Sequence, residues 1–327
     1  MSKSAPPISS SRHLVDPELL PMADAFPKVE LSDASLPEFR KLVAGIVNSE
    51  CSDAARKVNL SYRMVKAAED TPDIRLAVYR PSEPNHTLPV ILQMHGGGFV
   101  AGGIDGLEAR HRELVATLQC CLVAIDYRLA PETPFPGAIE DCYAALGWLV
   151  ENAAVVGVDP QSIVLMGESA GGGLAAALSL LARDRGEYRP SSQHLIYPML
   201  DDRTAFTTPV QPFAGEFVWT AGSNRFGWGA LLGAEAGGAD VSPYAAPARS
   251  ADLAGLPPTF LMTGALDLFA NEGIEYSRRL IGAGVPTELH VFPGAFHGFD
   301  LAISSHVGRA ARVASLASLT RALGLQV

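Results

Sequence analysis

SIVLMGESAGGGLAAALSLLARD, residues 162–184, sets a short apolar run directly against a stretch rich in alanine and leucine. The run is typical of a buried strand, and the stretch that follows favours a helix. Between them lies GESAGGG, in which Gly167 and Gly171 flank Ser169 by two residues. Strand, tight turn and helix are the context of the G-x-S-x-G elbow, where a nucleophilic serine is held in a strained conformation. The stretch therefore predicts an α/β fold with Ser169 as nucleophile.

Strands and helices are expected to alternate along the rest of the chain. Two half-buried strands of alternating polarity come first, at 58–65 and 74–80. Further strands are expected at 89–95, 120–126, 162–167, 194–198, 259–264 and 287–292, and helices at 107–119, 137–151, 170–184, 270–283 and 305–323. This order predicts a mostly parallel central sheet flanked by helices on both faces.

Two segments stand outside this alternation. Residues 36–47 carry apolar side chains at helical spacing, so we expect an N-terminal helical extension. Residues 201–245 show no clear strand, and we expect a helical insertion above the carboxyl ends of the strands, where open α/β folds bind ligands. The insertion holds the aromatic residues Phe206, Phe213, Phe217, Trp219, Phe226 and Trp228. Ordinary packing would explain most of these aromatics.

A serine hydroxyl needs a base, and that base needs a carboxylate to orient it. His297 is the best placed histidine, in GAFHGF just after the last expected strand, whereas His290 lies inside that strand. Asp267 follows the strand at 259–264, at the end of the sheet where Ser169 emerges. The order serine, aspartate, histidine is that of α/β hydrolases and differs from the orders in chymotrypsin and subtilisin. We expect Ser169, Asp267 and His297 to form a catalytic triad.

Catalysis by this triad also needs donors for the oxyanion of the tetrahedral intermediate. HGGGF, residues 95–99, follows an expected strand and can present backbone N–H groups with no side chain in the way. We expect the N–H groups of Gly97 and Gly98, together with that of Ala170 beside the nucleophile, to form the oxyanion hole.

Five motifs, in this order, resemble those of the bacterial hormone-sensitive-lipase-like esterases, family IV of the lipolytic enzymes: MHGGGFVAGG, DYRLAPETPFPGAIEDC, GESAGGG, GALDLFANEG and PGAFHGF. The resemblance runs from about residue 58 to residue 320 and implies an α/β-hydrolase fold. Residues 1–50 and 201–245 match the helical cap of that family, which leaves 51–200 and 246–327 as the catalytic domain.

The resemblance implies a serine carboxylesterase that acts on small-molecule esters without a cofactor. An apolar pocket under an aromatic-rich cap suits short to medium acyl chains. Glu168 stands where the family more often has Asp or Thr, and the sequence gives it no role. An amidase, lactonase or thioesterase would use the same groups, so these activities stay open.

Two interpretations from other classes are weaker. GGGFVA matches the nucleotide-binding pattern G-x-G-x-x-A at Gly96, Gly98 and Ala101, but at least two strands precede it and the P-loop lysine is missing. The second interpretation is a receptor without catalytic activity, because the gibberellin receptors resemble this esterase family. Those receptors have lost the catalytic histidine, whereas this chain keeps His297.

Composition narrows the partners and the location. The 327 residues carry a formal net charge of −10 and no run of Lys or Arg, which argues against a nucleic acid partner. No segment of about 18 apolar residues is present, so we expect no membrane span. The start, MSKSAPPISSSRHLVDPELL, lacks the apolar core of a signal peptide. We therefore predict a cytoplasmic protein.

The four cysteines, Cys51, Cys120, Cys121 and Cys142, show neither CxxC nor metal-site spacing, which favours packing over a disulfide or zinc role. Cys120 and Cys121 are neighbours in an expected strand, so their side chains should face opposite sides of the sheet. The strand at 287–292 is expected near the edge of the sheet. An exposed edge invites pairing, so a homodimer through this strand is a hypothesis.

Overall fold

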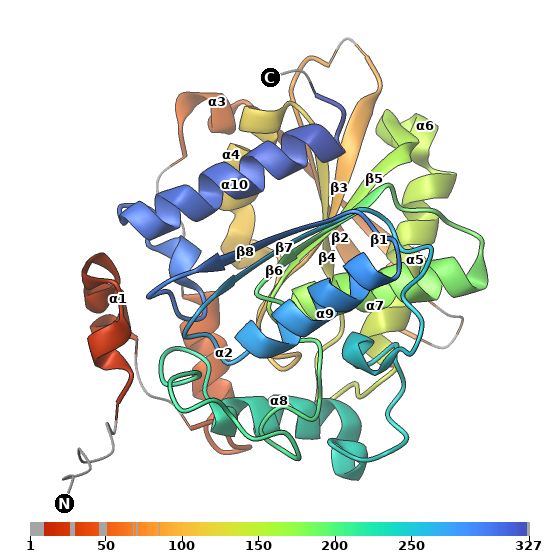
Figure 1. Cartoon of the computed structure of the whole chain (residues 1–327). Helices are drawn as coiled ribbons and strands as arrows, with labels where there is room; N and C mark the ends of the chain where they lie inside the picture. The colour runs from red at the N-terminus through yellow and green to blue at the C-terminus, as the bar shows by residue number, and fades with distance from the viewer. Residues whose placement is uncertain are drawn as a thin grey trace, which may run out of the picture.

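One sheet of eight strands organises the residues that the computed structural model describes, which are 10–26, 30–45, 51–67, 69, 71–84 and 86–325 (Figure 1). The strands are β1 (Asn59–Lys66), β2 (Asp73–Arg80), β3 (Leu88–Met94), β4 (Cys121–Asp126), β5 (Val158–Glu168), β6 (Ser192–Ile196), β7 (Thr259–Gly264) and β8 (Thr287–Phe292). Their spatial order is β1-β2-β4-β3-β5-β6-β7-β8, with β2 antiparallel to both its neighbours and the other pairs parallel. The predicted α/β-hydrolase sheet is confirmed.

Helices cover both faces of this sheet. The α-helices of the described residues are α1 (Leu20–Ala25), α2 (Leu36–Ala44), α3 (Asp53–Arg56), α4 (Glu108–Leu118), α5 (Gly137–Glu151), α6 (Ala153–Val156), α7 (Ala170–Arg185), α8 (Ala221–Leu232), α9 (Ala270–Gly282) and α10 (His306–Ala322). Short 3₁₀ turns lie at Arg12–Leu14, Pro17–Leu19, Asp105–Leu107, Gly233–Glu235, Pro247–Arg249 and Phe299–Leu301. Figure 1 shows α5, α7 and α9 on one face and α4 and α10 on the other.

Each face has its own buried apolar cluster. Leu146, Leu178 and Leu280 belong to the cluster under α5, α7 and α9, and Val115 and Leu319 belong to the cluster under α4 and α10. Cys121 lies in the first cluster and Cys120 in the second, so the two side chains do face opposite sides. Burial raises the pKa of the Cys121 thiol to about 12, which keeps it protonated and apolar in character.

The insertion at residues 201–245 contains less helix than expected. Its described regular structure is α8 and the 3₁₀ turn at Gly233–Glu235, and the rest is loop. Pro209 and Pro212 lie in the part without a helix, and proline has no N–H group for a helical hydrogen bond. Helices α2 and α8 lie together beyond one end of the sheet (Figure 1). The apolar position Ile46, part of the expected N-terminal helix, lies outside the described residues.

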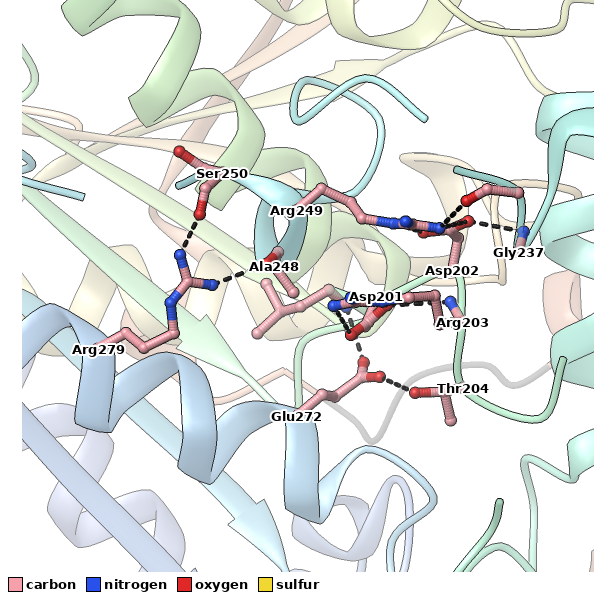
Figure 2. Close-up of polar contacts among 12 residues, drawn as sticks. Asp201, Asp202, Arg203, Thr204, Gly237, Ala248, Arg249, Ser250, Glu272 and Arg279 are labelled. Carbon is pink, nitrogen blue, oxygen red and sulfur yellow. Dashed lines mark hydrogen bonds and ion pairs between the residues drawn. The ribbon is translucent and has the colours of Figure 1, made fainter. Parts of the chain in front are cut away.

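A buried ion pair joins the start of the insertion to the segment that follows it, and an arginine of α9 holds that segment by its backbone. The Arg249 guanidinium donates to both carboxylate oxygens of Asp202, at 2.7 and 2.9 Å, and Asp202 also accepts from the N–H of Gly237 at 2.7 Å (Figure 2). Arg279 of α9 donates to the carbonyl oxygen of Ala248 at 2.7 Å and to that of Ser250 (Figure 2). The Asp202 side chain is wholly buried, so its charge depends on Arg249.

Glu272 of α9 anchors the first residues of the insertion (Figure 2). Its Oε1 accepts from the N–H of Leu200 at 2.8 Å and its Oε2 from the Thr204 hydroxyl at 2.5 Å. Burial raises the pKa of the Glu272 carboxyl well above its usual value. The nearby carboxylates of Asp201 and Asp267 act in the same direction, whereas the two hydrogen bonds oppose the shift.

Glu272→Gln is expected to change how stability depends on pH. Because the pKa of Glu272 is higher in the folded than in the unfolded protein, the folded protein binds more protons. Glu272 therefore contributes most to the free energy of unfolding below about pH 4.5, and this contribution is lost as pH rises through the folded pKa. Glutamine cannot titrate, so this fall, about 1.4 kcal/mol for each unit of pKa difference, should be absent from the variant.

Urea unfolding of both proteins from pH 5 to pH 8 measures this effect. The stability difference, variant minus wild type, should grow with pH. Glu275→Gln is the matched control, because Glu275 is an exposed carboxylate of the same helix, paired with Arg278 at 2.8 Å. Equal pH slopes for Glu272→Gln and the wild type would show that Glu272 is not a titrating group in this range.

Candidate active site

Ser169 lies on a strained turn between β5 and α7. Its backbone has φ 56° and ψ −119°, a conformation that residues other than glycine rarely adopt. A Cβ atom on Gly167 would lie 2.1 Å from the carbonyl oxygen of Gly171, and one on Gly171 would lie 2.1 Å from that of Met94. Both positions therefore require glycine. The geometry matches the elbow that the sequence predicts.

The three residues of the expected triad form one continuous chain of contacts. The Ser169 Oγ lies 2.9 Å from His297 Nε2, and His297 Nδ1 lies 2.8 Å from Asp267 Oδ2. Ser169 and His297 are each 6% exposed and Asp267 is fully buried. The structure thus brings together all three residues from separate loops that follow β5, β7 and β8.

Asp267 has a fixed orientation. Its Oδ1 accepts a hydrogen bond from the N–H of Phe269 at 2.9 Å, which leaves Oδ2 for His297. The residue also lies three positions before the start of α9, where the helix dipole stabilises a negative charge. The Phe269 ring meets the His297 ring edge to face, with the centroids 5.3 Å apart. This side of the imidazole is therefore packed as well as hydrogen-bonded.

The loop after β3 lies against the serine. A Cβ on Gly96 would be 3.4 Å from the Cβ of Ser169. Gly97 and Gly98 have φ of 130° and 62°, which directs their peptide groups in a way that favours glycine. Among the described residues, the N–H groups of Gly97, Gly98 and Ala170 donate to no protein acceptor. They are free to bind an oxygen atom of a substrate.

His95 supports this loop rather than acting as a base. Its Nδ1 is 2.8 Å from the carbonyl oxygen of Gly96, and its ring stacks on Tyr127 with centroids 4.2 Å apart. The Tyr127 hydroxyl donates to the His95 carbonyl oxygen at 2.7 Å. Burial lowers the pKa of His95, so its ring is neutral. The segment DYRLAPE, which contains Tyr127, thus braces the loop as expected from the sequence.

The other histidines do not lie in this site. His13, His86 and His306 are exposed, as the sequence predicts. His111 and His194 are buried, and burial lowers the pKa of each to about 3. His290 lies in β8 and contacts Glu288 at 2.7 Å, which agrees with a structural role. These positions leave His297 as the histidine next to Ser169.

One aromatic residue of the insertion reaches the site. The Trp219 ring lies over Gly98, where a Cβ would be 2.1 Å from its Cη2 atom, and its centroid is 6.4 Å from that of His297. The indole Nε1 donates to Asn224 Oδ1 of α8 at 3.3 Å. Phe39 of α2 packs on the same indole at 6.4 Å between centroids. The sequence did not distinguish Trp219 from its aromatic neighbours.

The other insertion aromatics pack elsewhere or face solvent. Phe217 packs on Phe296, and Trp228 packs on Phe99. Phe206 and Phe213 are more than a third exposed. Phe226 is partly buried against the core, so three of the six aromatics serve packing, fewer than expected.

Helix α2 is tied directly to the loop that carries the glycines. Arg40 donates through Nε to the carbonyl oxygen of Val100 at 2.7 Å and through a terminal nitrogen to that of Ala130 at 3.1 Å. It also pairs with Glu132 at 2.7 Å, and this hydrogen bond lowers the pKa of Glu132 to about 2. This contact could not be predicted from the sequence, because an isolated arginine on a helix usually faces solvent.

In the part of the chain that the structure describes, no helix is long and apolar enough to span a membrane.

Comparison with known proteins gives consistent matches. A sequence profile of the alpha/beta hydrolase fold matches residues 91–301. The chain is 37% identical over 260 residues to carboxylesterase NlhH of Mycobacterium tuberculosis, covering 77% of this chain and 79% of that one. It is 33% identical over 303 residues to esterase LipI of the same species, covering 87% and 88%. The solved structure of a bacterial heroin esterase matches with a TM-score of 0.88 at 37% identity, covering 96% and 99%.

Proposed function

The chain belongs to the α/β-hydrolase fold family and is a carboxylesterase related to the hormone-sensitive-lipase-like esterases, and from this premise we propose that Ser169, His297 and Asp267 are its catalytic triad. The observation that carries the proposal is the unbroken chain of contacts from Ser169 Oγ through the His297 ring to Asp267, with distances of 2.9 and 2.8 Å. Both distances are within hydrogen-bonding range.

The proposed reaction has two halves. His297 Nε2 takes the proton of Ser169 as Oγ attacks the ester carbonyl carbon, and the same proton then goes to the leaving alkoxide, which departs as an alcohol. A water molecule next attacks the acyl carbon and gives its proton to His297, the bond to Ser169 Oγ breaks, and Oγ takes that proton back as the carboxylic acid leaves. Asp267 holds the imidazole so that Nε2 faces the serine, and stabilises the charged imidazolium.

Gly97, Gly98 and Ala170 are proposed to supply the oxyanion hole. Support comes from their free N–H groups and from the place of the glycine loop against Ser169. Removing a single oxyanion donor typically lowers kcat by about 10²- to 10³-fold.

Gly98→Ala tests this part of the proposal. A methyl group at φ 62° is strained, and its Cβ would be 2.1 Å from the Trp219 ring, so the peptide or the indole must move. We expect kcat to fall about 10²- to 10³-fold. The matched control is Gly186→Ala at the end of α7, which has φ 74° and no atom within 4 Å of its Cβ. That control should lose about 1 kcal/mol of stability and keep its kcat. Similar kcat values for the two variants would count against the proposed hole.

Residues 1–50 and 201–245 are proposed to form a cap over the site. Support comes from the Trp219 and Phe39 contacts above Gly98 and from the docking of Arg40 on the glycine loop. The rings of Trp219 and Phe39 lie close to the oxyanion glycines. We propose that they limit the acyl chain of the substrate to a short or medium length. β8 has one strand neighbour in the described sheet, so a homodimer through its free edge is also proposed.

A series of p-nitrophenyl esters from acetyl to palmitoyl tests the function and the chain-length preference together. We expect kcat/KM to be highest between acetyl and octanoyl and to fall for longer chains, with selectivity of about 1 to 3 kcal/mol per methylene at most. The Ser169→Ala protein sets the background. Highest activity on palmitoyl would contradict the proposed preference. An amide and a lactone, tested in parallel, define the range of reactions.

A further inference from the structure

Glu168, the residue before the nucleophile, is buried at the end of β5 with 8% of its surface exposed. Its Oε2 accepts a hydrogen bond from Gln93 Nε2 of β3 at 2.8 Å, and its Oε1 lies 3.5 Å from a terminal nitrogen of Arg110 of α4. Burial raises the pKa of this carboxyl, and Arg110 and Gln93 oppose the shift. The carboxyl group next to the nucleophile is therefore held by side chains from two neighbouring elements, β3 and α4.

Arg110 links Glu168 to the loop that carries the catalytic histidine. The same terminal nitrogen lies 3.0 Å from Oδ2 of Asp300, whose side chain is 3% exposed. Asp300 follows His297 by three residues, in the 3₁₀ turn Phe299–Leu301. One guanidinium thus bridges a carboxylate next to the nucleophile and a carboxylate next to the base.

Tyr197 returns this chain of contacts to the imidazole. Its hydroxyl donates to Asp300 Oδ1 at 2.6 Å, and its ring packs on the His297 ring with centroids 4.7 Å apart at 60°. Tyr197 follows β6 directly, is 4% exposed, and has a φ of 34°, which is unusual for a residue other than glycine. Its backbone is fixed by a hydrogen bond to Met262 of β7 at 2.6 Å.

Burying two carboxylates costs desolvation free energy, so stability alone does not explain them. An apolar cluster of the same volume usually stabilises a fold at least as well as a buried ion pair. Removing one member of such a group leaves an uncompensated charge, so its neighbours move. Here the members that would move adjoin Ser169 on one side and His297 on the other.

We propose that Glu168, Arg110, Asp300 and Tyr197 are positioning residues that fix the distance between Ser169 Oγ and His297 Nε2. This inference rests on the proposed triad. Arg110 sets the separation of the β5 elbow from the histidine loop, and Tyr197, oriented by Asp300, supports one face of the imidazole. None of the four touches the scissile ester.

Glu168→Gln and Asp300→Asn test this role with minimal change in volume. We expect each to lower kcat about 10- to 100-fold and to change KM less than about 3-fold, because a displacement of about 1 Å at reacting atoms can cost 100-fold in rate. Burst titration with p-nitrophenyl butyrate counts competent serines, so kcat is measured per folded site. Asp141→Asn is the matched control, since Asp141 is fully buried and its carboxylate pairs with Arg128 rather than with a triad or positioning residue.

The double variant reports whether the two carboxylates act through one link. Because both depend on Arg110, the loss of kcat in Glu168→Gln/Asp300→Asn should be much smaller than the product of the two single losses. Arg110→Lys, which keeps a cation, should retain more of kcat than Arg110→Met. Tyr197→Phe removes one oxygen atom and keeps the ring contact with His297. It should lower kcat about 3- to 10-fold. If a carboxylate variant does not fold, this variant tests the positioning role in its place.

Three results would overturn the proposal. The first is a kcat within about 2-fold of wild type for the carboxylate variants or, where these do not fold, for Tyr197→Phe. The second is a loss confined to KM, and the third is a loss no larger than that of Asp141→Asn. Hydrolysis that persists in Ser169→Ala would instead overturn the proposed triad, and the positioning role with it.

Discussion

Ser169→Ala is expected to lower kcat for p-nitrophenyl butyrate by about 10⁴- to 10⁶-fold. Among the described side chains, Ser169 Oγ is the only nucleophilic atom within hydrogen-bonding range of His297 Nε2, and the variant lacks it. The residual rate would come from water attack at a site that still binds the ester and its oxyanion. Burst titration should find no competent serine.

Stability separates loss of chemistry from loss of fold. Alanine removes one oxygen atom from Ser169, a residue that is 6% exposed. The free energy of unfolding should therefore change by less than about 1 kcal/mol. Ser179→Ala is the matched control: Ser179 is a buried serine of α7 that donates to the Ala175 carbonyl oxygen at 3.0 Å. It should keep wild-type kcat. Activity of Ser169→Ala within 10-fold of the wild type would refute the assignment of the nucleophile.

Asp267→Asn is expected to lower kcat about 10⁴-fold with little change in KM. The orientation of the new amide follows from the backbone, because Oδ1 must still accept from the N–H of Phe269. The NH₂ group then faces His297 Nδ1 and donates to it, which places the ring proton on Nε2. Nε2 can no longer accept the proton of Ser169, although it remains in contact with that residue.

The loss of kcat in Asp267→Asn can be assigned to chemistry only if the variant stays folded. Asp267→Asn removes a buried negative charge, so we expect no large destabilisation, and Asp141→Asn reports the general cost of a buried aspartate-to-asparagine change. A melting temperature like that of the wild type together with a 10⁴-fold lower kcat would support the tautomer argument. Wild-type kcat in Asp267→Asn would show that another group orients His297.

The sequence predicts the sheet, its covering helices and the three residues of the proposed triad, because each of these predictions depends on local pattern. The strands at Thr259–Gly264 and Thr287–Phe292 have the expected bounds, since glycine and proline punctuate both ends. Ser169, Asp267 and His297 could be proposed as the triad because each lies within five residues of the end of a parallel strand. Residues at the carboxyl ends of such strands meet at one edge.

What the sequence did not predict depends on contacts between distant segments. Arg110 and Asp300 are 190 positions apart and each resembles an ordinary surface charge in its own helix or turn. Trp219 is one of several aromatics in a loop, and its place over Gly98 results from Asn224 and Phe39. β5 begins four residues earlier than expected, at Val158, because Leu88 pairs with that residue across an irregular register. No local pattern contains that information.

The crowded glycines of the elbow determine where new substrate preferences can arise. At Gly167 and Gly171 any side chain would collide with backbone atoms, so a library of variants at these positions would yield unfolded or inactive proteins. A Cβ added at Gly229, in α8, would meet no atom within 4 Å. Directed evolution of this enzyme should therefore leave the sheet edge unchanged and randomise the loops around α8, where the scaffold can absorb change and still present the same triad to a different ester.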